Sequence, residues 1–188
     1  MEAFLVSLST IAVAEVGDRT QLLSLVLAAR YRKPLPIIAG ILCATLANHA
    51  AAGFVGLWVG SRLKPELLQI VVGVSMIAMA LWTLKPDELE EGAAAPSAAG
   101  AFLATLTGFF IAEIGDKTQV ATMALAAAYA NLSIVVLGTT LGMLAANAPV
   151  VFLGKAFADR LPLKVIHYAA SVLFLIIGAV FLFRALRR

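Results

Sequence analysis

The chain has 188 residues, of which 62% are hydrophobic and only 13% charged, and its formal net charge is +3. A typical soluble domain carries about 25% charged residues, and a soluble fold of this size could not hide so much apolar surface. The mean hydropathy of +0.97 therefore argues against a soluble enzyme, a nucleic-acid-binding domain or a disordered chain. It indicates an integral membrane protein. The single cysteine, Cys43, excludes an internal disulfide and a cysteine-rich metal site.

Six apolar runs account for most of the chain. A transmembrane helix needs about 20 mainly apolar residues, and lipid admits only helices or closed barrels, whose strands would alternate in polarity. Basic residues and a proline mark several of the breaks between the runs. The sequence therefore predicts an all-α membrane protein with six transmembrane helices, at about 3–29, 35–60, 66–84, 101–129, 132–157 and 164–184.

Residues 85–100 differ from the rest of the chain. Their first part is acidic, and their second part is rich in alanine, proline and glycine. This composition is typical of a solvated connection. We therefore expect a first three-helix repeat at 1–84, a linker at 85–100 and a second three-helix repeat at 101–188.

The two halves repeat one another in sequence. Shifting residues 4–63 by 98 positions aligns them with residues 102–161 without a gap and gives 21 identities. A composition this rich in alanine and leucine would match at roughly a tenth of the positions by chance. Because each half has three helices, an odd number, the second half must enter the membrane from the opposite side. The sequence thus predicts an inverted repeat, an architecture that secondary transporters use to build a substrate site near the midplane.

The strongest chemical signal is a heptapeptide that occurs once in each half. It reads Glu-Val-Gly-Asp-Arg-Thr-Gln at 15–21 and Glu-Ile-Gly-Asp-Lys-Thr-Gln at 113–119, in the middle of apolar runs. Ionisable groups at the bilayer centre cost about 2.5–3.5 kcal/mol each on an insertion scale, so these groups must face one another, a polar cavity or an ion. On a continuous helix the two acids and the glutamine of each copy would share one face. The pseudo-two-fold axis would then bring four carboxylates together.

Charge and ligand type both favour a divalent cation at this place. Four carboxylates and two basic side chains leave a net charge of −2, which one divalent cation would neutralise. Oxygen ligands suit hard cations such as Ca²⁺, Mg²⁺ and Mn²⁺. Without a cation, four close carboxylates cannot all stay ionised, so protons and metal would compete for the same oxygens. The predicted metal ligands are Glu15, Asp18, Glu113, Asp116, Gln21, Gln119, Thr20 and Thr118, and Arg19 and Lys117, each one helical turn from its glutamate, are the predicted charge-balancing residues.

Glycines and further polar residues complete the candidate site. Gly17 and Gly115 remove a side chain between the acids, which permits close helix approach or local unwinding. Thr20 and Thr118 point away from the acidic face of an ideal helix, so they become ligands only where the helix unwinds. The second helix of each half adds candidates for outer ligands or a proton relay, with interhelical hydrogen bonding as the equally simple alternative; these are Asn48, His49 and Asn147.

Other interpretations of the acidic motifs stay open at this point. The acids and bases could form self-satisfied ion pairs that fix helix register, although buried pairs contribute little stability. An exporter of amino acids or other organic cations would need a large apolar pocket beside the acids. An intramembrane phosphatase would need a nucleophile and a basic phosphate clamp, and no such cluster adjoins the motifs. A non-transporting membrane scaffold would tolerate neutralisation of the acids.

The doubled motif Glu-x-Gly-Asp-Lys/Arg-Thr-Gln in a six-helix inverted repeat resembles the family of bacterial manganese exporters and eukaryotic Golgi and chloroplast Mn²⁺/Ca²⁺ transporters, within the lysine-exporter superfamily. The resemblance covers nearly the whole chain, and both copies match at every position. It implies a secondary transporter that exports Mn²⁺, or Ca²⁺, in exchange for protons. It implies no cofactor, since the metal is the substrate. A chain this short, with no organelle-targeting extension, suits a bacterial inner membrane.

Overall fold

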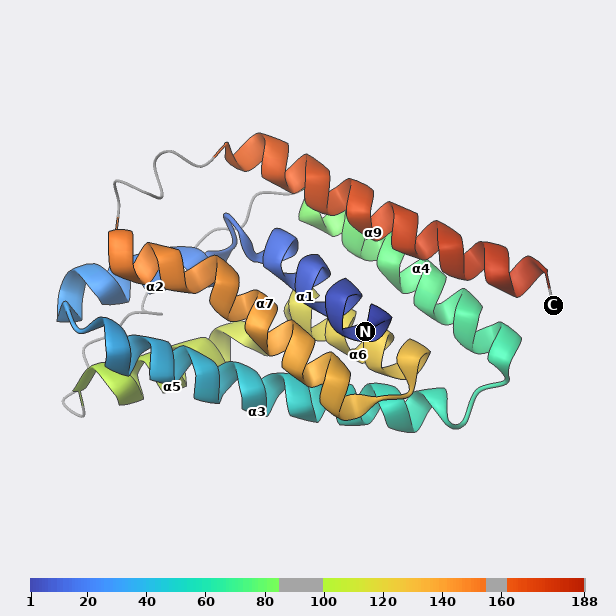
Figure 1. Cartoon of the computed structure of the whole chain (residues 1–188), viewed down its shortest axis with the longest axis horizontal. Helices are drawn as coiled ribbons and strands as arrows, with labels where there is room; N and C mark the ends of the chain where they lie inside the picture. The colour runs from blue at the N-terminus through green and yellow to red at the C-terminus, as the bar shows by residue number, and fades with distance from the viewer. Residues whose placement is uncertain (85–99, 155–161, 188) are drawn as a thin grey trace.

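The computed structural model describes residues 1–84, 100–154 and 162–187, and every regular element in these ranges is an α-helix (Figure 1). This confirms the predicted all-α class. In chain order the helices are α1 (Glu2–Glu15), α2 (Arg19–Tyr31), α3 (Pro34–Gly60), α4 (Pro65–Thr83), α5 (Gly100–Glu113), α6 (Lys117–Tyr129), α7 (Leu132–Leu153) and α9 (Leu163–Leu186).

Four of these helices, α3, α4, α7 and α9, are long and apolar enough to cross a membrane. Their starts follow from local sequence. Pro34 and Pro65 stand in the first turns of α3 and α4, where a missing N–H is harmless. The side chain of Asn131 caps α7 by accepting a hydrogen bond from the N–H of Ile134 at 3.2 Å. These four helices correspond to the second, third, fifth and sixth predicted spans.

The first and fourth predicted spans are wrong as continuous helices. Residues 3–29 are divided between α1 and α2, and residues 101–129 between α5 and α6. Gly17 has a φ of +82° and Gly115 a φ of +75°, a left-handed conformation through which a right-handed helix cannot continue. Each break places one helix end and one helix start inside the bundle, where side chains must satisfy the freed backbone groups.

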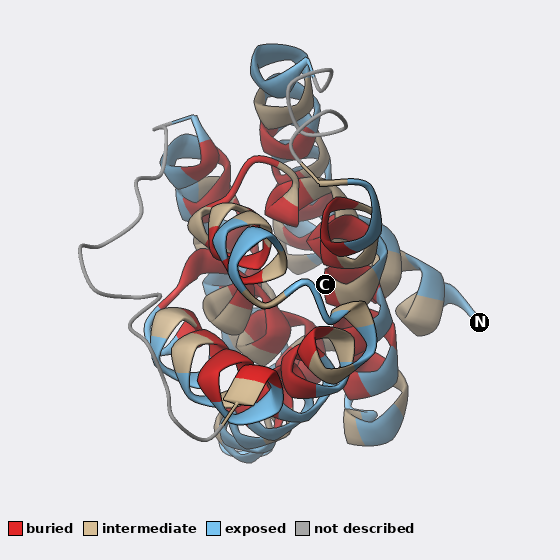
Figure 2. Cartoon of the chain, turned by 90° about the vertical axis from the view of Figure 1, so that its left-hand side faces the viewer, coloured by how far each residue is buried: buried red, intermediate tan, exposed pale blue. Residues whose placement is uncertain are grey.

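The two halves of the chain interlock across the bundle. Helix α1 lies along α7, and α5 lies along α3. Glycines allow these approaches: a Cβ at Gly138 would lie 2.8 Å from the Phe4 carbonyl oxygen, and a Cβ at Gly40 would lie 2.9 Å from the Phe102 carbonyl oxygen. The two contacts correspond under the 98-residue shift. Seen from one end, the buried residues lie on the inward sides of the helices (Figure 2).

Helices α4 and α9 form a pair along one side of the bundle (Figure 1). They cross at two glycines, because a Cβ at Gly73 would lie 3.0 Å from the Gly178 carbonyl oxygen and a Cβ at Gly178 would lie 2.8 Å from that of Gly73. The pair is the least buried of the long helices: 33% of the apolar window of α4 and 28% of that of α9 are buried, against 50% for α3 and 61% for α7. Apolar surface of this extent suits contact with lipid.

The predicted linker lies outside the described residues, apart from Gly100, which begins α5. The division into repeats at 1–84 and 101–188 therefore stays a prediction. Packing of α3 against α5 and of α4 against α6 joins the two halves across the bundle.

Candidate cation site

The first copy of the heptapeptide forms the break between α1 and α2. Helix α1 ends at Glu15, Val16 is extended, and Gly17 turns the chain with its positive φ. Asp18 then stands at the N-cap of α2. The side-chain oxygen of Gln21 reaches back and accepts a hydrogen bond from the N–H of Gly17 at 2.8 Å. The motif therefore encodes a helix end, a turn and a new helix start, with a glutamine at the third helical position as in a capping box.

The second copy repeats this local structure between α5 and α6. Asp116 stands at the N-cap and accepts a hydrogen bond from the N–H of Thr118 at 3.2 Å, and the side-chain oxygen of Gln119 accepts one from the N–H of Gly115 at 2.9 Å. Because both helices break here, the acids do not share a helix face as we predicted. The glutamine oxygens serve the backbone in this structure, and their role as metal ligands stays a prediction.

Alanine substitution of the two motif glycines is expected to have unequal effects. Both glycines have positive φ, which costs an L-residue about 1–2 kcal/mol. At Gly17 the new methyl would also lie 2.8 Å from His167 Nε2 and 2.9 Å from Leu163 Cδ2, whereas at Gly115 no described residue would lie within 4 Å of it. Thermal unfolding in detergent should therefore show a larger loss of stability for Gly17→Ala than for Gly115→Ala. Equal losses would mean that backbone strain alone sets the effect.

Three of the four predicted acidic ligands converge between the breaks. One carboxylate oxygen from each of Glu15, Asp18 and Asp116 lies within 4.8 Å of the other two, and none of these residues is more than 2% exposed. Calcium binds oxygens at about 2.3–2.6 Å, so oxygens on opposite sides of one ion lie about 5 Å apart. The spacing of the three carboxylates is therefore compatible with shared coordination of one hard cation.

The basic residue of each motif pairs with the aspartate of the other motif. Lys117 Nζ contacts Asp18 Oδ1, and Arg19 Nη2 lies 3.3 Å from Asp116 Oδ1. We predicted that each basic residue would lie one helical turn from its own glutamate, and the helix breaks remove that spacing. The crossed pairs instead tie the first motif to the second at the centre of the bundle.

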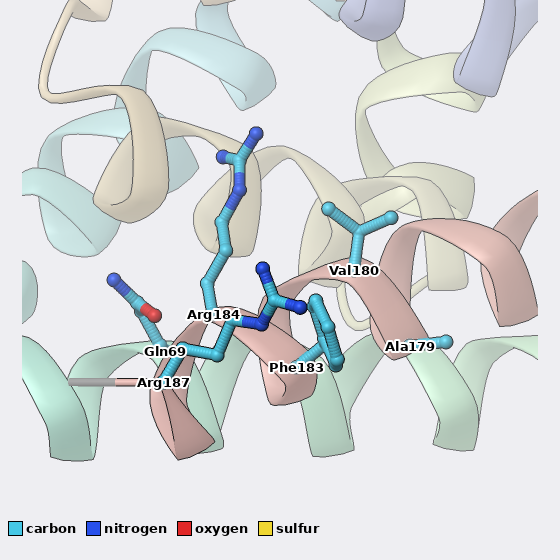
Figure 3. A pocket seen from close by; sticks show the side chains of 6 residues that line it. All are labelled: Gln69, Ala179, Val180, Phe183, Arg184 and Arg187. Carbon is cyan, nitrogen blue, oxygen red and sulfur yellow. The ribbon is translucent and has the colours of Figure 1, made fainter.

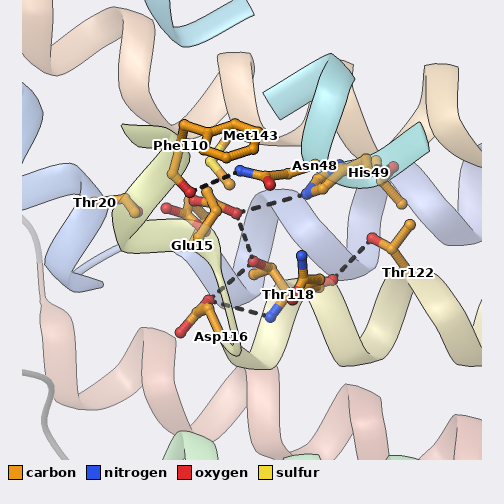
Figure 4. Close-up of polar contacts among 12 residues, drawn as sticks. Glu15, Thr20, Asn48, His49, Phe110, Asp116, Thr118, Thr122 and Met143 are labelled. Atoms are coloured by element: carbon orange, nitrogen blue, oxygen red, sulfur yellow. Dashed lines mark hydrogen bonds and ion pairs between the residues drawn. The ribbon is translucent and has the colours of Figure 1, made fainter. Parts of the chain in front are cut away.

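Glu113, the fourth predicted carboxylate, contacts Thr118 and His49, two residues beside this cluster that are labelled in Figure 4. Its Oε2 atom lies 3.2 Å from Thr118 Oγ1 and 3.7 Å from His49 Nε2. The same threonine hydroxyl lies 2.9 Å from Asp116 Oδ2. Since a hydroxyl has one proton, it donates to one carboxylate at a time. Thr118 therefore links Glu113 to the cluster, and it reaches the acids because the helix has unwound.

Polar residues of α3 and α7 surround the two glutamates. Asn147 Nδ2 lies 3.5 Å from Glu15 Oε1, and the Asn147 oxygen accepts a hydrogen bond from Ser24 Oγ at 2.7 Å. His49 Nδ1 lies 2.9 Å from Thr139 Oγ1, and its other ring nitrogen faces Glu113. His49 and Asn147, which align in sequence, thus each approach the glutamate of the other half.

The remaining candidates lie further from the acids or contact them weakly. Asn48 Nδ2 donates a hydrogen bond to the Phe110 carbonyl oxygen at 3.1 Å, an interhelical contact. Thr20 Oγ1 lies 3.4 Å from Asp18 Oδ2. Ser24 and Thr139 contact site residues but were not predicted from the sequence. Ser24 aligns with another hydroxyl residue under the 98-residue shift, a signal that could have found it, whereas Thr139 belongs to no motif.

Two buried carboxylate oxygens of the site, Glu15 Oε2 and Glu113 Oε1, receive no hydrogen bond from the residues that the structure describes. Both glutamates are 0% exposed. An ionised oxygen buried without a donor is strongly unfavourable, so such a group must be neutralised by a proton or a cation. The site thus has two positions at which either species would be stabilised.

Two cavities elsewhere have no acidic side chain among the described residues that line them. One of about 720 Å³ lies at the end of α9 against α4 and is lined by Gln69, Ala179, Val180, Phe183, Arg184 and Arg187 (Figure 3). Another, of about 520 Å³, lies between the α2 and α7 regions. An organic cation would need acidic groups in its pocket, and the described lining of these two cavities contains none.

Comparison with known proteins identifies the kind of transporter. A family model described as "Divalent cation/proton antiporter GDT1" matches residues 3–91 and 101–188. The chain belongs to this family. It is 53% identical over 179 residues to the "Putative manganese exporter" of Vibrio cholerae, which covers 95% of this chain and 89% of that protein. The "GDT1-like protein sll0615" of Synechocystis is 28% identical over 203 residues, with 96% of each chain covered. No solved structure matches the chain.

Membership in the GDT1 family confirms the resemblance drawn from the doubled motif. The chain is a multi-pass membrane protein of a family of divalent cation/proton antiporters, not an intramembrane phosphatase. Its similarity to a Vibrio protein over most of both chains points to a bacterial source. The family model matches the chain in two segments, and each segment contains one copy of the heptapeptide.

Proposed function

We propose that this GDT1-family protein exports Mn²⁺ in exchange for protons across the bacterial inner membrane. The observation that carries the proposal is the convergence of buried oxygens from Glu15, Asp18 and Asp116 within 4.8 Å of one another. With Glu113 and the two basic residues included, the site has a net charge of −2, which one divalent cation neutralises. The printed name of the Vibrio relative supports Mn²⁺ as the cation, and Ca²⁺ is the second candidate because it prefers the same oxygen ligands.

The proposed architecture is a six-span inverted repeat in which the broken pairs α1–α2 and α5–α6 each complete one crossing. Its support is a set of matched contacts. The α1–α7 packing corresponds to α5–α3, and the α2–α7 packing corresponds to α6–α3. The crossed ion pairs also correspond, since each joins the basic residue of one motif to the aspartate of the other. Discontinuous helices that meet near the midplane are how such transporters place a substrate site in the membrane.

Exchange follows from competition for the same oxygens. Mn²⁺ binds when the carboxylates are ionised, and protons take over the unpaired oxygens of Glu15 and Glu113 when the ion leaves. The crossed pairs hold Asp18 and Asp116 in place in both forms. His49 and Asn147 hold the side chains of Glu113 and Glu15 in position from α3 and α7. Alternating access then requires the two sides of the site to open in turn.

Flux into proteoliposomes tests the proposal. We expect Mn²⁺ transport to follow an imposed pH gradient, to reverse when the gradient is reversed and to be accompanied by counter-movement of protons. Ca²⁺ measured in parallel gives the cation preference. Mn²⁺ flux that is indifferent to the pH gradient would exclude proton exchange, and absence of flux for both ions from folded protein would exclude the proposed substrate.

A further inference from the structure

One helix pair departs from the symmetry of the rest. This inference rests on the proposed inverted repeat, under which α1 corresponds to α5, α2 to α6, α3 to α7 and α4 to α9. Among α1, α2, α3, α5, α6 and α7, each extended helix–helix contact is matched by the contact between the corresponding helices of the other half. However, α9 packs on α1 and α4 packs on α6. In an exactly symmetric structure α4 would also pack on α5, and α9 would also pack on α2. Neither of these is an extended contact within the described ranges.

The surroundings of the two motif breaks also depart from the symmetry. A Cβ at Gly17 would lie 2.8 Å from His167 Nε2 and 2.9 Å from Leu163 Cδ2, both on the first turns of α9, whereas a Cβ at Gly115 would meet nothing within 4 Å. Gly17 is accordingly buried and Gly115 exposed. Helix α9 therefore covers the first break, while the second break has no such cover among the described residues.

The symmetry counterpart of the covering residue lies elsewhere. Under the 98-residue shift, Leu163 corresponds to Pro65 and His167 to Gln69, at matching positions on the first turns of α9 and α4. Gln69 does not lie at Gly115. It lines the cavity beside Arg184 and Arg187, at the far end of α9 (Figure 3). The α4–α9 pair thus lies towards α1 and α6 and away from α2 and α5.

We propose that α4 and α9 move together as one gate, with Leu163 and His167 covering the first motif break in the state described and Pro65 and Gln69 covering the second break in the opposite state. The Gly73–Gly178 crossing keeps the pair together during the movement. The displacement is feasible because only 33% of the apolar window of α4 and 28% of that of α9 are buried. Sliding such a face exchanges one lipid contact for another, with no hydrophobic driving force to oppose it.

Matched cysteine pairs test this movement in a Cys43→Ser background. The pair Val16→Cys with His167→Cys reports the state described here, and its symmetry counterpart, Ile114→Cys with Gln69→Cys, reports the opposite state. A short reducible cross-linker is applied in proteoliposomes under each direction of the pH gradient, with Mn²⁺ present. We expect both pairs to cross-link, with yields that change in opposite directions when the gradient is reversed. Each cross-link should lower the Mn²⁺ flux at least tenfold, and cleavage of the cross-linker with a reductant should restore the flux.

A third pair is the control for movement within the gate. Gln69→Cys with Arg184→Cys joins α4 to α9 across the cavity that both residues line. Because the two helices move together, this cross-link should form under both gradients and leave flux within about twofold of the reduced protein. Flux of the reduced form of every pair is measured first, so that a misfolded variant is recognised and replaced by Leu163→Cys with Val16→Cys or Pro65→Cys with Ile114→Cys.

Two outcomes would overturn the gate. One is continued transport by protein cross-linked between positions 16 and 167. The other is failure of positions 114 and 69 to cross-link under either gradient in protein that transports. Failure of the proposed function is distinguishable, because it appears as absent Mn²⁺ flux in the reduced proteins, whereas the two cross-linking yields report the movement of α4 and α9 whether or not Mn²⁺ is the substrate.

Discussion

Glu15→Gln is expected to lower Mn²⁺ flux by about 100-fold or more. Even residues that merely support metal ligands change affinity or activity by about 10–100-fold when replaced, and Glu15 itself supplies one of the three converging oxygens. Glutamine keeps the shape of the side chain but removes one negative charge, so the site can no longer neutralise a divalent cation. Initial rates of Mn²⁺ uptake into proteoliposomes measure the effect, and Glu113→Gln should reduce flux in the same direction.

The matched control is Glu66→Gln, the same substitution at an exposed glutamate on the first turn of α4. It should leave flux within about twofold of the wild type. Both variants are compared for folded yield and thermal stability before transport is measured. If Glu15→Gln retained more than half of the wild-type flux while folding normally, the converging carboxylates could not be the transport site.

Asp18→Asn is expected to destabilise the protein by about 3 kcal/mol, at the lower end of the 3–5 kcal/mol seen when one partner of a buried ion pair is removed. The reason is that Lys117, its partner, is only 2% exposed and would keep a buried charge with less compensation. Asp116→Asn should cost less, because its partner Arg19 is 23% exposed and can be hydrated. Thermal unfolding in detergent at one pH ranks the two variants.

A double variant distinguishes the loss of the Asp18–Lys117 ion pair from the loss of Asp18 as the N-cap of α2. Asp18→Asn combined with Lys117→Met removes both charges and should recover much of the stability lost in Asp18→Asn, since replacement of a whole buried pair by neutral groups is often nearly neutral. Transport should not recover, because an acidic ligand is still missing. Equal instability of the single and double variants would show that Asp18 acts through its N-cap position on α2 rather than through the pair.

The helix breaks illustrate where prediction from sequence stops. Glycine, aspartate and glutamine in the order found at 15–21 are compatible with a continuous helix and with a break. The continuous form would align the acids on one face, and we predicted that form. The choice depends on whether the freed N–H of Gly17 finds an acceptor, which Gln21 provides, and on whether the broken ends are buried among other helices. Only the second condition is a property of the whole fold.

Partners across the site could not be predicted for a related reason. Asp18 and Lys117 are 99 residues apart in the chain, Glu15 and Asn147 are 132 apart, and such contacts depend on how the helices of the two halves pack. The pseudo-two-fold axis predicted that the two motifs would meet, but not that each basic residue would choose the aspartate of the other motif. That choice follows from the three-residue breaks, which turn each new helix and its first basic residue towards the opposite half.

The sequence by itself determined the membrane class, the doubled acidic motif, the net charge of the site and the residue types that favour a hard cation, because these depend on composition and on short spacings. Family membership follows from the same motifs. Only the tertiary structure decided that the helices break at the motifs, that Thr118 reaches the carboxylates and that α9 covers one break while no described residue covers the other in the same way. Those features arise from packing between distant segments, in which a few ångströms of displacement change which groups are in contact.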